Sequence, residues 1–314
     1  MTINFWRDKK VVVTGGNGFL GRHLVAKIKA RKPKRIFVPK KTKYDLRVYN
    51  NCVRVVRKGN IVIHLAGNVG GIGFNREFPA DLYDDNILMG TYMMMAARKM
   101  NVKKYIALGT VCAYPKFTKV PFKEENLWEG YPEETNAPYG LAKKMQLVQA
   151  EAYRKQYSFN AIFLLPVNLY GPGDNFDLKS SHVIPALIRK FIDAKEKRKS
   201  EVVVWGTGKA SREFLYVDDA AEAILLAAEK YDKSEPVNLG TGREVKIREL
   251  VRLIKKYSGY KGRVIWDTAR PDGQPRRRMN IDKARKEFGF KAKTSLETGL
   301  KKTIEWYIRD KNKI

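Results

Sequence analysis

Residues 11–21 read Val-Val-Val-Thr-Gly-Gly-Asn-Gly-Phe-Leu-Gly, an apolar run followed by glycines at GxxGxxG spacing. The valines predict a buried strand, and a helix is expected from about Phe19 to Arg31. Glycines between a strand and a helix let the helix N-terminus approach a diphosphate, whose charge is favoured by free N–H groups and the helix dipole. A Gly-rich turn can also be purely structural, but this position after the first strand favours dinucleotide binding. The candidate cofactor residues of the turn are Gly15, Asn17, Gly18, Phe19, Leu20 and Gly21.

Apolar strands alternate with amphipathic helices over the first half of the chain. This pattern predicts an α/β fold, a Rossmann-type doubly wound parallel sheet, with a smaller mixed α/β lobe at the C-terminal side. Residues 1–170 are expected to form the dinucleotide-binding domain, with about 210–245 returning to it, and 171–314 to form mainly the substrate-binding lobe. The further strands are expected at 35–38, 61–64, 104–108 and 161–165, and the further helices at 48–57, at 80–100 and from Tyr139.

The composition is that of an ordinary globular protein, since 44% of the 314 residues are hydrophobic. No stretch approaches the roughly 18 apolar residues of a membrane span, and the segment Met1 to Lys10 carries charges where a signal peptide would be apolar. The expected location is therefore cytoplasmic, with no membrane partner. Cys52 and Cys112 provide no disulfide framework, and three scattered histidines give no recognisable zinc site.

The net charge of +29 is concentrated at the two ends of the chain. Residues 1–60 carry +15, residues 61–242 carry +1 and residues 243–314 carry +13. Such an excess can steer phosphate-bearing small molecules or bind nucleic acid, and it can also reflect a generally lysine-rich composition. A nucleic-acid-binding protein on a Rossmann scaffold is thus an alternative from another class, although no specific nucleic acid partner is expected.

The end of the second strand indicates which dinucleotide is bound. An acidic residue at this place binds the 2′-hydroxyl of NAD, whereas basic residues accept the 2′-phosphate of NADP. The strand here runs into Pro39-Lys40-Lys41-Thr42-Lys43, which predicts NADP(H) with Lys40 and Lys41 as phosphate partners. The alternative is that these lysines belong to the general basic excess of the N-terminal region.

Tyr139 and Lys143 are four residues apart, so on a helix both side chains lie on one face. A nearby ammonium favours tyrosinate, which allows the tyrosine to exchange a proton with a substrate oxygen during hydride transfer. Thr110 follows a predicted strand and can hold the same oxygen with its hydroxyl. The three side chains together predict carbonyl reduction or its reverse.

These motifs resemble the extended short-chain dehydrogenases/reductases, and within them the GDP-L-fucose synthase family, from about Lys10 to about Trp306. The resemblance rests on the motifs above and on further ordered segments. They are His64–Gly67 (HLAG), Val69–Ile72 (VGGI), Cys112–Lys116 (CAYPK), Pro166–Pro172 (PVNLYGP), Ser181–Leu187 (SHVIPAL), Val204–Gly206 (VWG) and Arg212–Phe214 (REF).

The resemblance implies an NADPH-dependent 3,5-epimerase/4-reductase of GDP-4-keto-6-deoxy-mannose. It makes Cys112 the base and His182 the acid of epimerisation, which suits a substrate whose C4 ketone acidifies the protons at C3 and C5. A buried inert thiol and a histidine that caps a backbone group are the structural alternatives. A homodimer through the helices at 80–100 and 139–157 is also implied. The implied cofactor residues are Leu65, Ala66, Leu108, Gly109, Tyr139, Lys143, Pro166, Asn168, Leu169 and His182, and the substrate residues are Thr110, Cys112, Asn168, Lys190, Trp205, Arg212 and Arg270.

Three positions depart from the family pattern. Asn17 stands where the Gly-rich loop carries a basic residue, Thr110 replaces a serine, and Val111 replaces a second small polar residue. The substrate can therefore be a related GDP-sugar such as a 4-keto heptose. C4 reduction without epimerisation and NAD-dependent epimerisation stay open as alternative reactions.

Overall fold

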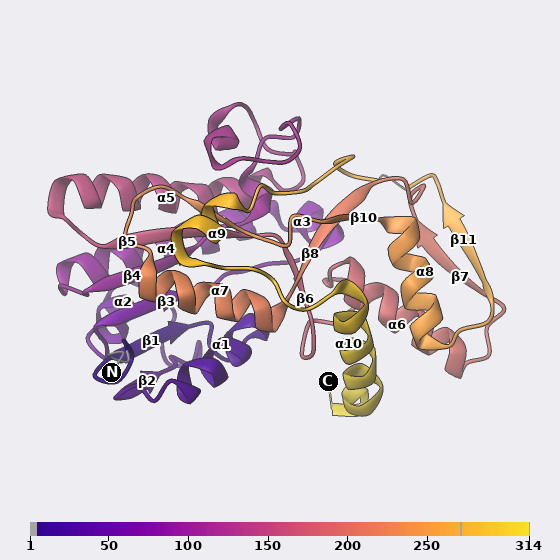
Figure 1. Cartoon of the computed structure of the whole chain (residues 1–314), viewed down its shortest axis with the longest axis horizontal. Helices are drawn as coiled ribbons and strands as arrows, with labels where there is room; N and C mark the ends of the chain where they lie inside the picture. Colours follow the sequence, from indigo (N-terminus) through magenta and orange to yellow (C-terminus); the bar gives the residue numbers. More distant parts are fainter. Residues whose placement is uncertain (1–4, 271, 314) are drawn as a thin grey trace.

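The computed structural model of the chain describes residues 5–270 and 272–313, so the first four residues of the charged N-terminal segment lie outside the described part (Figure 1). Its larger body is built on a six-stranded sheet in which every strand pair is parallel. The predicted Rossmann-type fold is confirmed. In spatial order the strands are β2 (Arg35–Phe37), β1 (Lys10–Thr14), β3 (Ile61–His64), β4 (Lys104–Leu108), β5 (Ala161–Pro166) and β9 (Val237–Leu239).

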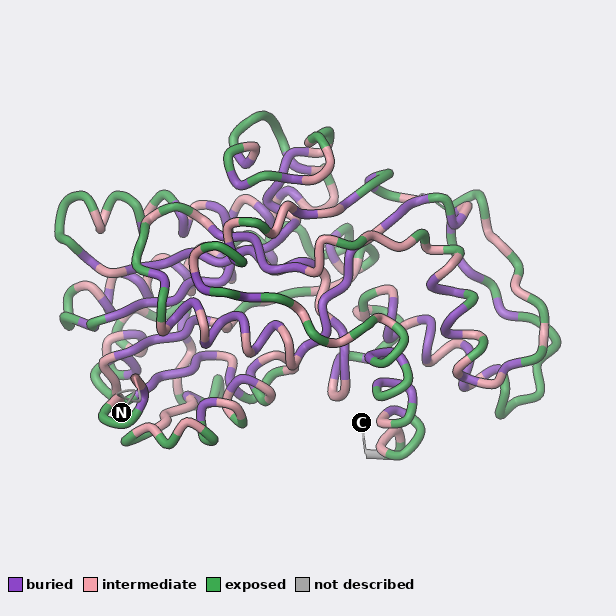
Figure 2. Tube along the Cα trace, viewed as in Figure 1, coloured by how far each residue is buried: buried purple, intermediate pink, exposed green. Residues whose placement is uncertain are grey.

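Helices cover both faces of this sheet, which explains why β3 and β4 are buried at every residue and read as continuous apolar runs. In one layer α1 (Phe19–Ala30) packs on α7 (Val217–Lys230). The other layer contains α2 (Tyr49–Val56), α4 (Pro79–Lys99) and α5 (Ala137–Tyr157), of which α4 and α5 lie side by side. The buried residues run through the centre of these layers (Figure 2).

The smaller lobe has one mixed three-stranded sheet, one parallel pair of strands and its own apolar core. Phe176 stacks on Tyr307 in this core with ring centroids 4.4 Å apart, and Phe191 is fully buried. The predicted domain boundaries stay a prediction, although α7 and β9 lie with the large sheet. The strands of the lobe are β6 (Asn168–Tyr170), β8 (Ser211–Tyr216) and β10 (Glu244–Lys246) in one sheet and β7 (Glu201–Trp205) with β11 (Arg263–Asp267) in another, and its helices are α6 (Val183–Glu196), α8 (Ile247–Ser258) and α10 (Leu296–Asp310).

Short helical segments occupy the connections. They are α3 (Ile72–Glu77) before α4, the 3₁₀ turns η1 (Val111–Ala113) and η2 (Glu124–Trp128) before α5, α9 (Asp282–Phe288) against α7, and η3 (Lys311–Lys313). Among the described residues, no helix is long and apolar enough to cross a membrane. Nor does that part of the chain hold a group of three or more His, Cys, Asp or Glu side chains that could bind a metal ion.

Asp174, in the turn between β6 and α6, is a buried carboxyl that should weaken the fold at neutral pH. One of its oxygens accepts a hydrogen bond from the Asn175 N–H at 2.7 Å, and the other has no partner in the described part of the chain. Burial raises the pKa of Asp174 to about 7. The folded protein therefore keeps this proton between about pH 4 and 7 whereas the unfolded chain releases it, so stability falls as the pH rises through this window.

We expect Asp174→Asn to stabilise the fold by up to about 4 kcal/mol at pH 8, because the amide never becomes charged and can still accept from Asn175. Thermal unfolding at pH 8 and pH 4 measures this. The gain in Tm should be large at pH 8 and small at pH 4. An equal gain at both pH values would contradict a protonated carboxyl in the native state.

Candidate active site

A cavity of about 1000 Å³ lies between the two bodies of the molecule. One wall is formed by the residues that follow β1, β3, β4 and β5, and the other by α6, by residues of β7 and β8, and by the loop 272–277. Ligands of doubly wound sheets bind at this carboxyl edge of the strands. The position of the cavity therefore agrees with the cofactor site predicted from the glycine turn.

The glycine turn is packed so tightly that two of its glycines leave no room for a larger residue. Gly15 has a φ of +67°, and a Cβ on it would lie 2.8 Å from the backbone nitrogen of Ala66. A Cβ on Gly21 would lie 2.1 Å from the carbonyl oxygen of Gly15. Among the described residues no side chain caps the start of α1 at Gly18, and the first residues of the helix line the cavity. This cradle fits a dinucleotide diphosphate.

The HLAG segment supports the same edge of the sheet. His64 ends β3 with its side chain fully buried, and its Nδ1 lies 2.8 Å from the hydroxyl oxygen of Thr14. That hydroxyl also accepts a hydrogen bond from the Ala66 N–H at 3.2 Å. Burial holds the pKa of His64 well below its usual value, so the imidazole is neutral and structural.

Tyr139 and Lys143 lie in the first turns of α5, as the YxxxK spacing predicts. Burial raises the pKa of the Tyr139 phenol, the charge of Cys112 raises it further, and a hydrogen bond with the Thr110 side chain opposes both. The expectation that the nearby ammonium favours tyrosinate is wrong for the resting site, because burial outweighs it. The phenol is therefore protonated at neutral pH and can act as an acid. Lys143 is only 4% exposed, and burial lowers its pKa to about 8.

Cys112 sits in the turn η1, directly after Thr110. Its backbone N–H donates to the Thr110 hydroxyl at 3.2 Å, so one threonine contacts both the cysteine and the tyrosine. The Cys112 side chain is partly exposed and lines the cavity, whereas Cys52 is buried and its thiol donates to the Leu46 carbonyl at 3.1 Å. The inert buried thiol of this chain is Cys52.

His182 reaches the cavity from the opposite lobe, as the residue that precedes α6. Its side chain makes no capping hydrogen bond to the helix, which removes the capping role as an explanation for it. The protein around the ring lowers the pKa of His182 by desolvation. A thiol and an imidazole from two different lobes thus line one cavity.

The comparison with known proteins identifies the family. Residues 11–240 match the NAD dependent epimerase/dehydratase family. This chain belongs to that family. The chain is 40% identical over 312 residues to a probable GDP-L-fucose synthase 1 from Oryza sativa, which covers 98% of this chain and 95% of the relative. The resemblance to extended short-chain dehydrogenases/reductases predicted from the motifs is confirmed.

Solved structures of other nucleotide-sugar enzymes have the same fold. A GDP-6-OMe-4-keto-L-xylo-heptose reductase from C. jejuni superposes with a TM-score of 0.91 at 29% identity, covering 97% of this chain and 99% of that one. A GDP-L-fucose synthetase from Naegleria fowleri bound to NADP gives a TM-score of 0.87 at 29% identity, covering 96% and 94% of the two chains.

The structure of this epimerase/dehydratase family member brings together almost every predicted cofactor residue. All of them line the cavity except Lys40, which is exposed and is not among the lining residues. Lys41 lines the cavity next to Pro39. The cavity-lining members are Gly15, Asn17, Gly18, Phe19, Leu20, Gly21, Lys41, Leu65, Ala66, Leu108, Gly109, Tyr139, Lys143, Pro166, Asn168, Leu169 and His182.

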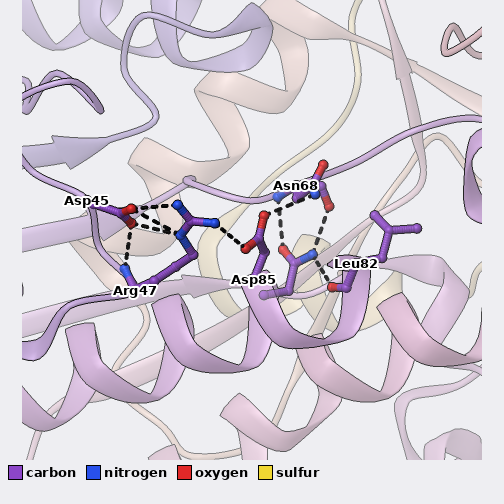
Figure 3. Close-up of polar contacts among 6 residues, drawn as sticks. Asp45, Arg47, Asn68, Leu82 and Asp85 are labelled. Atoms are coloured by element: carbon purple, nitrogen blue, oxygen red, sulfur yellow. Dashed lines mark hydrogen bonds and ion pairs between the residues drawn. The ribbon is translucent and has the colours of Figure 1, made fainter. Parts of the chain in front are cut away.

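Sequence reasoning missed a polar network at the same end of the cavity (Figure 3). Arg47 binds Asp45 at 2.6 Å and Asp85 at 3.0 Å, and Asp85 accepts a hydrogen bond from Asn68 at 3.1 Å. Asn86 on α4 donates to the Asn68 carbonyl at 2.8 Å. The hydrogen bonds with Arg47 hold the pKa of Asp45 at about 2. The network joins the loop after β2 to the loop after β3. It neutralises the charge of Arg47, whereas Lys41 has no ion pair in the described part of the chain.

Three of the predicted substrate residues, Lys190, Trp205 and Arg212, line the end of the cavity that the small lobe forms. Lys190 donates to the Val203 carbonyl at 3.1 Å, and its ammonium lies 5.5 Å from the centre of the half-exposed Trp205 ring. Arg270 lies 5.1 Å from the same ring but does not itself line the cavity. Arg212 lines the cavity, and so do Asp272, Gln274 and Arg277, which sequence reasoning missed. Arg277 is the one of these that touches a predicted catalytic residue.

Proposed function

We propose that this chain is an NADPH-dependent 3,5-epimerase/4-reductase of a GDP-4-keto sugar of the 4-keto-6-deoxy-mannose type, giving a GDP-L-fucose-type product. One observation carries the proposal. The reductive residues Tyr139 and Lys143 and the thiol of Cys112 line a single cavity, and Thr110 contacts both Tyr139 and Cys112. A plain dehydrogenase needs no thiol at this place. The activities by which the relatives are named support the same reaction class.

For the reduction, NADPH bound along the glycine turn supplies the hydride that reaches C4. Tyr139, protonated at neutral pH, donates its phenolic proton to the C4 oxygen as charge develops there. Thr110 orients the phenol and offers a hydroxyl to the same oxygen. Lys143, buried beneath, carries a positive charge below about pH 8 that stabilises the tyrosinate left behind.

For the epimerisation, the C4 ketone acidifies the protons at C3 and C5. The Cys112 thiolate removes one proton and becomes the thiol, while protonated His182 delivers another to the opposite face of the carbon. Because desolvation lowers the pKa of His182, the imidazole takes up this proton from solvent, and the thiol returns one to solvent, before each centre is inverted. Each centre is inverted without net oxidation. Two groups from two different lobes suit this task because they approach the sugar from different walls of the cavity.

We assign the guanosine diphosphate to the end of the cavity with Lys190, Arg212 and Trp205. The cations suit the diphosphate, and the exposed indole offers a flat surface for a base or a sugar. Arg270 supports the indole from outside the cavity through its position over the ring.

NADPH oxidation followed by absorbance tests the proposed function. Loss of absorbance is expected with GDP-4-keto-6-deoxy-mannose and not with its UDP counterpart. A GDP-4-keto heptose is the second candidate substrate, because the structure with a TM-score of 0.91 is a heptose reductase. Absence of oxidation with every GDP-keto sugar would refute the proposal.

Lys41, which lines the cavity, should set the preference for NADPH through the 2′-phosphate. We expect Lys41→Glu to raise the KM for NADPH by about 10- to 100-fold and to change the KM for NADH little, because one lost charge-assisted contact costs about 1.5–3 kcal/mol. Lys40→Glu is the matched control, since Lys40 is the exposed neighbour outside the cavity. Equal effects of the two variants, or equal losses with NADH, would remove Lys41 from this role.

A homodimer through α4 and α5 is part of the proposal. These helices lie side by side in one layer and carry the exposed Tyr83, Val148 and Tyr157, which a four-helix contact between two copies would cover. Light scattering on the purified protein should give twice the chain mass.

A cytoplasmic location is proposed because both cysteines are free thiols, which suits a reducing compartment.

A further inference from the structure

The loop 272–278 runs from the small lobe back to the large one and is fixed at both of its ends. Near its start, the Gln274 side chain donates to the Lys116 carbonyl at 2.8 Å. At its end, the Arg278 carbonyl accepts from the Phe122 N–H at 2.8 Å. The backbone of Arg277 therefore has a set position beside the catalytic turn η1.

The Arg277 side chain is a buried cation that contacts the thiol of Cys112. It is 8% exposed and lines the cavity. Its Nε donates to Gln274 Oε1 at 3.0 Å, and its Nη1 lies 3.6 Å from Cys112 Sγ. No carboxylate forms an ion pair with it among the described residues. A guanidinium stays charged in proteins, so this contact brings a full positive charge to the sulfur.

The neighbouring Arg212 has a different surrounding. It donates to the backbone carbonyls of Ser211 at 2.8 Å, Gln274 at 2.5 Å and Asp272 at 3.1 Å. Burial, together with the charge of Arg277, lowers the pKa of Arg212 to about 10. Its donors are thus engaged by the main chain, and Arg277 is the cation that reaches the sulfur.

The backbone of Cys112 is held from the other side. The Thr110 hydroxyl accepts its N–H, and Gly140 of α5 approaches so closely that a Cβ there would lie 2.4 Å from the Cys112 carbonyl oxygen. The main chain of the cysteine is fixed by the large domain, while the sulfur itself is contacted by a residue of the loop that returns from the small lobe.

We propose that Arg277 is a positioning residue for Cys112, which orients the sulfur toward the substrate and stabilises the thiolate that removes the proton. The inference rests on the proposed role of Cys112 as the base of epimerisation. A charge-assisted N–H to sulfur contact favours the nucleophilic and basic form of a cysteine. When the thiolate takes the substrate proton it becomes neutral, and the guanidinium stays in place for the next turnover.

Alkylation of Cys112 by iodoacetamide at neutral pH tests the contact without any substrate. The rate is read by mass spectrometry of the Cys112 peptide, with the buried Cys52 as an internal reference for unfolding. We expect Arg277→Gln to react roughly tenfold more slowly than the wild type, and Arg277→Lys, which keeps the charge, to recover most of the rate. Arg276→Gln is the matched control, because Arg276 is exposed and paired with Glu244. Unchanged or faster alkylation of Arg277→Gln would overturn the proposal.

A second measurement protects the test against a folding defect of Arg277→Gln. Alkylation of the variant and of the wild type is repeated at about pH 10, where a cysteine thiol ionises without help from a neighbouring cation. The two rates should converge at this pH, and a variant that stays slow there would contradict the role of the Arg277 charge.

Turnover in deuterated water measures proton exchange and C4 reduction separately. A purely structural role of Arg277 would not change the ratio of the two rates. In Arg277→Gln, deuterium entry at C3 and C5 should fall about tenfold relative to C4 reduction. An equal fall of both would overturn the positioning role. If the wild type turned over no GDP-keto sugar, the proposed function would fail, while the alkylation rates would still decide whether Arg277 controls Cys112.

Discussion

Tyr139→Phe is expected to lower the rate of NADPH oxidation by about 10³-fold, because it removes the proton that the C4 oxygen receives during hydride transfer. The substitution deletes one hydroxyl, so NADPH binding and thermal stability should change little. Burial keeps the Tyr139 phenol protonated at neutral pH, which makes it an acid in the direction of reduction. Steady-state rates and NADPH titration by fluorescence measure the two quantities separately.

Tyr131→Phe is the control for this experiment. Tyr131 is 63% exposed and lies outside the cavity, so the same chemical change should leave the rate unaltered. A Tyr139→Phe enzyme that kept more than about a tenth of the wild-type rate would assign the proton to another donor.

Cys112→Ser is expected to reduce proton exchange at C3 and C5 by about 10²- to 10³-fold while NADPH binds as before. Serine keeps the shape of the side chain and its N–H contact with Thr110, but its hydroxyl does not ionise at neutral pH. The ketone can still accept hydride at C4, so the variant should release a reduced sugar that has not been inverted. Deuterium incorporation and product stereochemistry by NMR are the measurements.

Cys52→Ser is the matched control for the thiol, since Cys52 is buried away from the cavity and contacts the Leu46 carbonyl. It should leave the exchange at C3 and C5 unchanged, although it can lower stability. Full exchange in Cys112→Ser would remove Cys112 from the mechanism and leave the chain a reductase with an unrelated base.

The parts of the site that sequence alone predicted are encoded locally. The glycine turn follows its strand directly, and the spacing of Tyr139 and Lys143 fixes both on one face of α5. In the charge run after β2, however, sequence could not tell Lys40 from Lys41. Adjacent side chains point in different directions, and only the path of the backbone shows which one faces the cavity.

Side-chain contacts between segments far apart in the chain could not be predicted from the sequence. Arg277 lies 165 positions after Cys112 within a basic C-terminal region, so nothing in its local sequence distinguishes it from its neighbours. The Arg47 network likewise depends on the approach of α4 to the loop after β2 (Figure 3). The strand alternation predicted the parallel sheet, whereas the tight coupling of the two lobes through the loop 272–278 required the structure.

In the proposed function one cavity inverts two carbons of the sugar and reduces a third. The direct test is to incubate the protein with GDP-4-keto-6-deoxy-mannose and NADPH in deuterated water and to analyse the product by NMR. The expected product is reduced at C4 and carries deuterium at both C3 and C5. Reduction at C4 without deuterium at either carbon would contradict it and would define the chain as a 4-reductase.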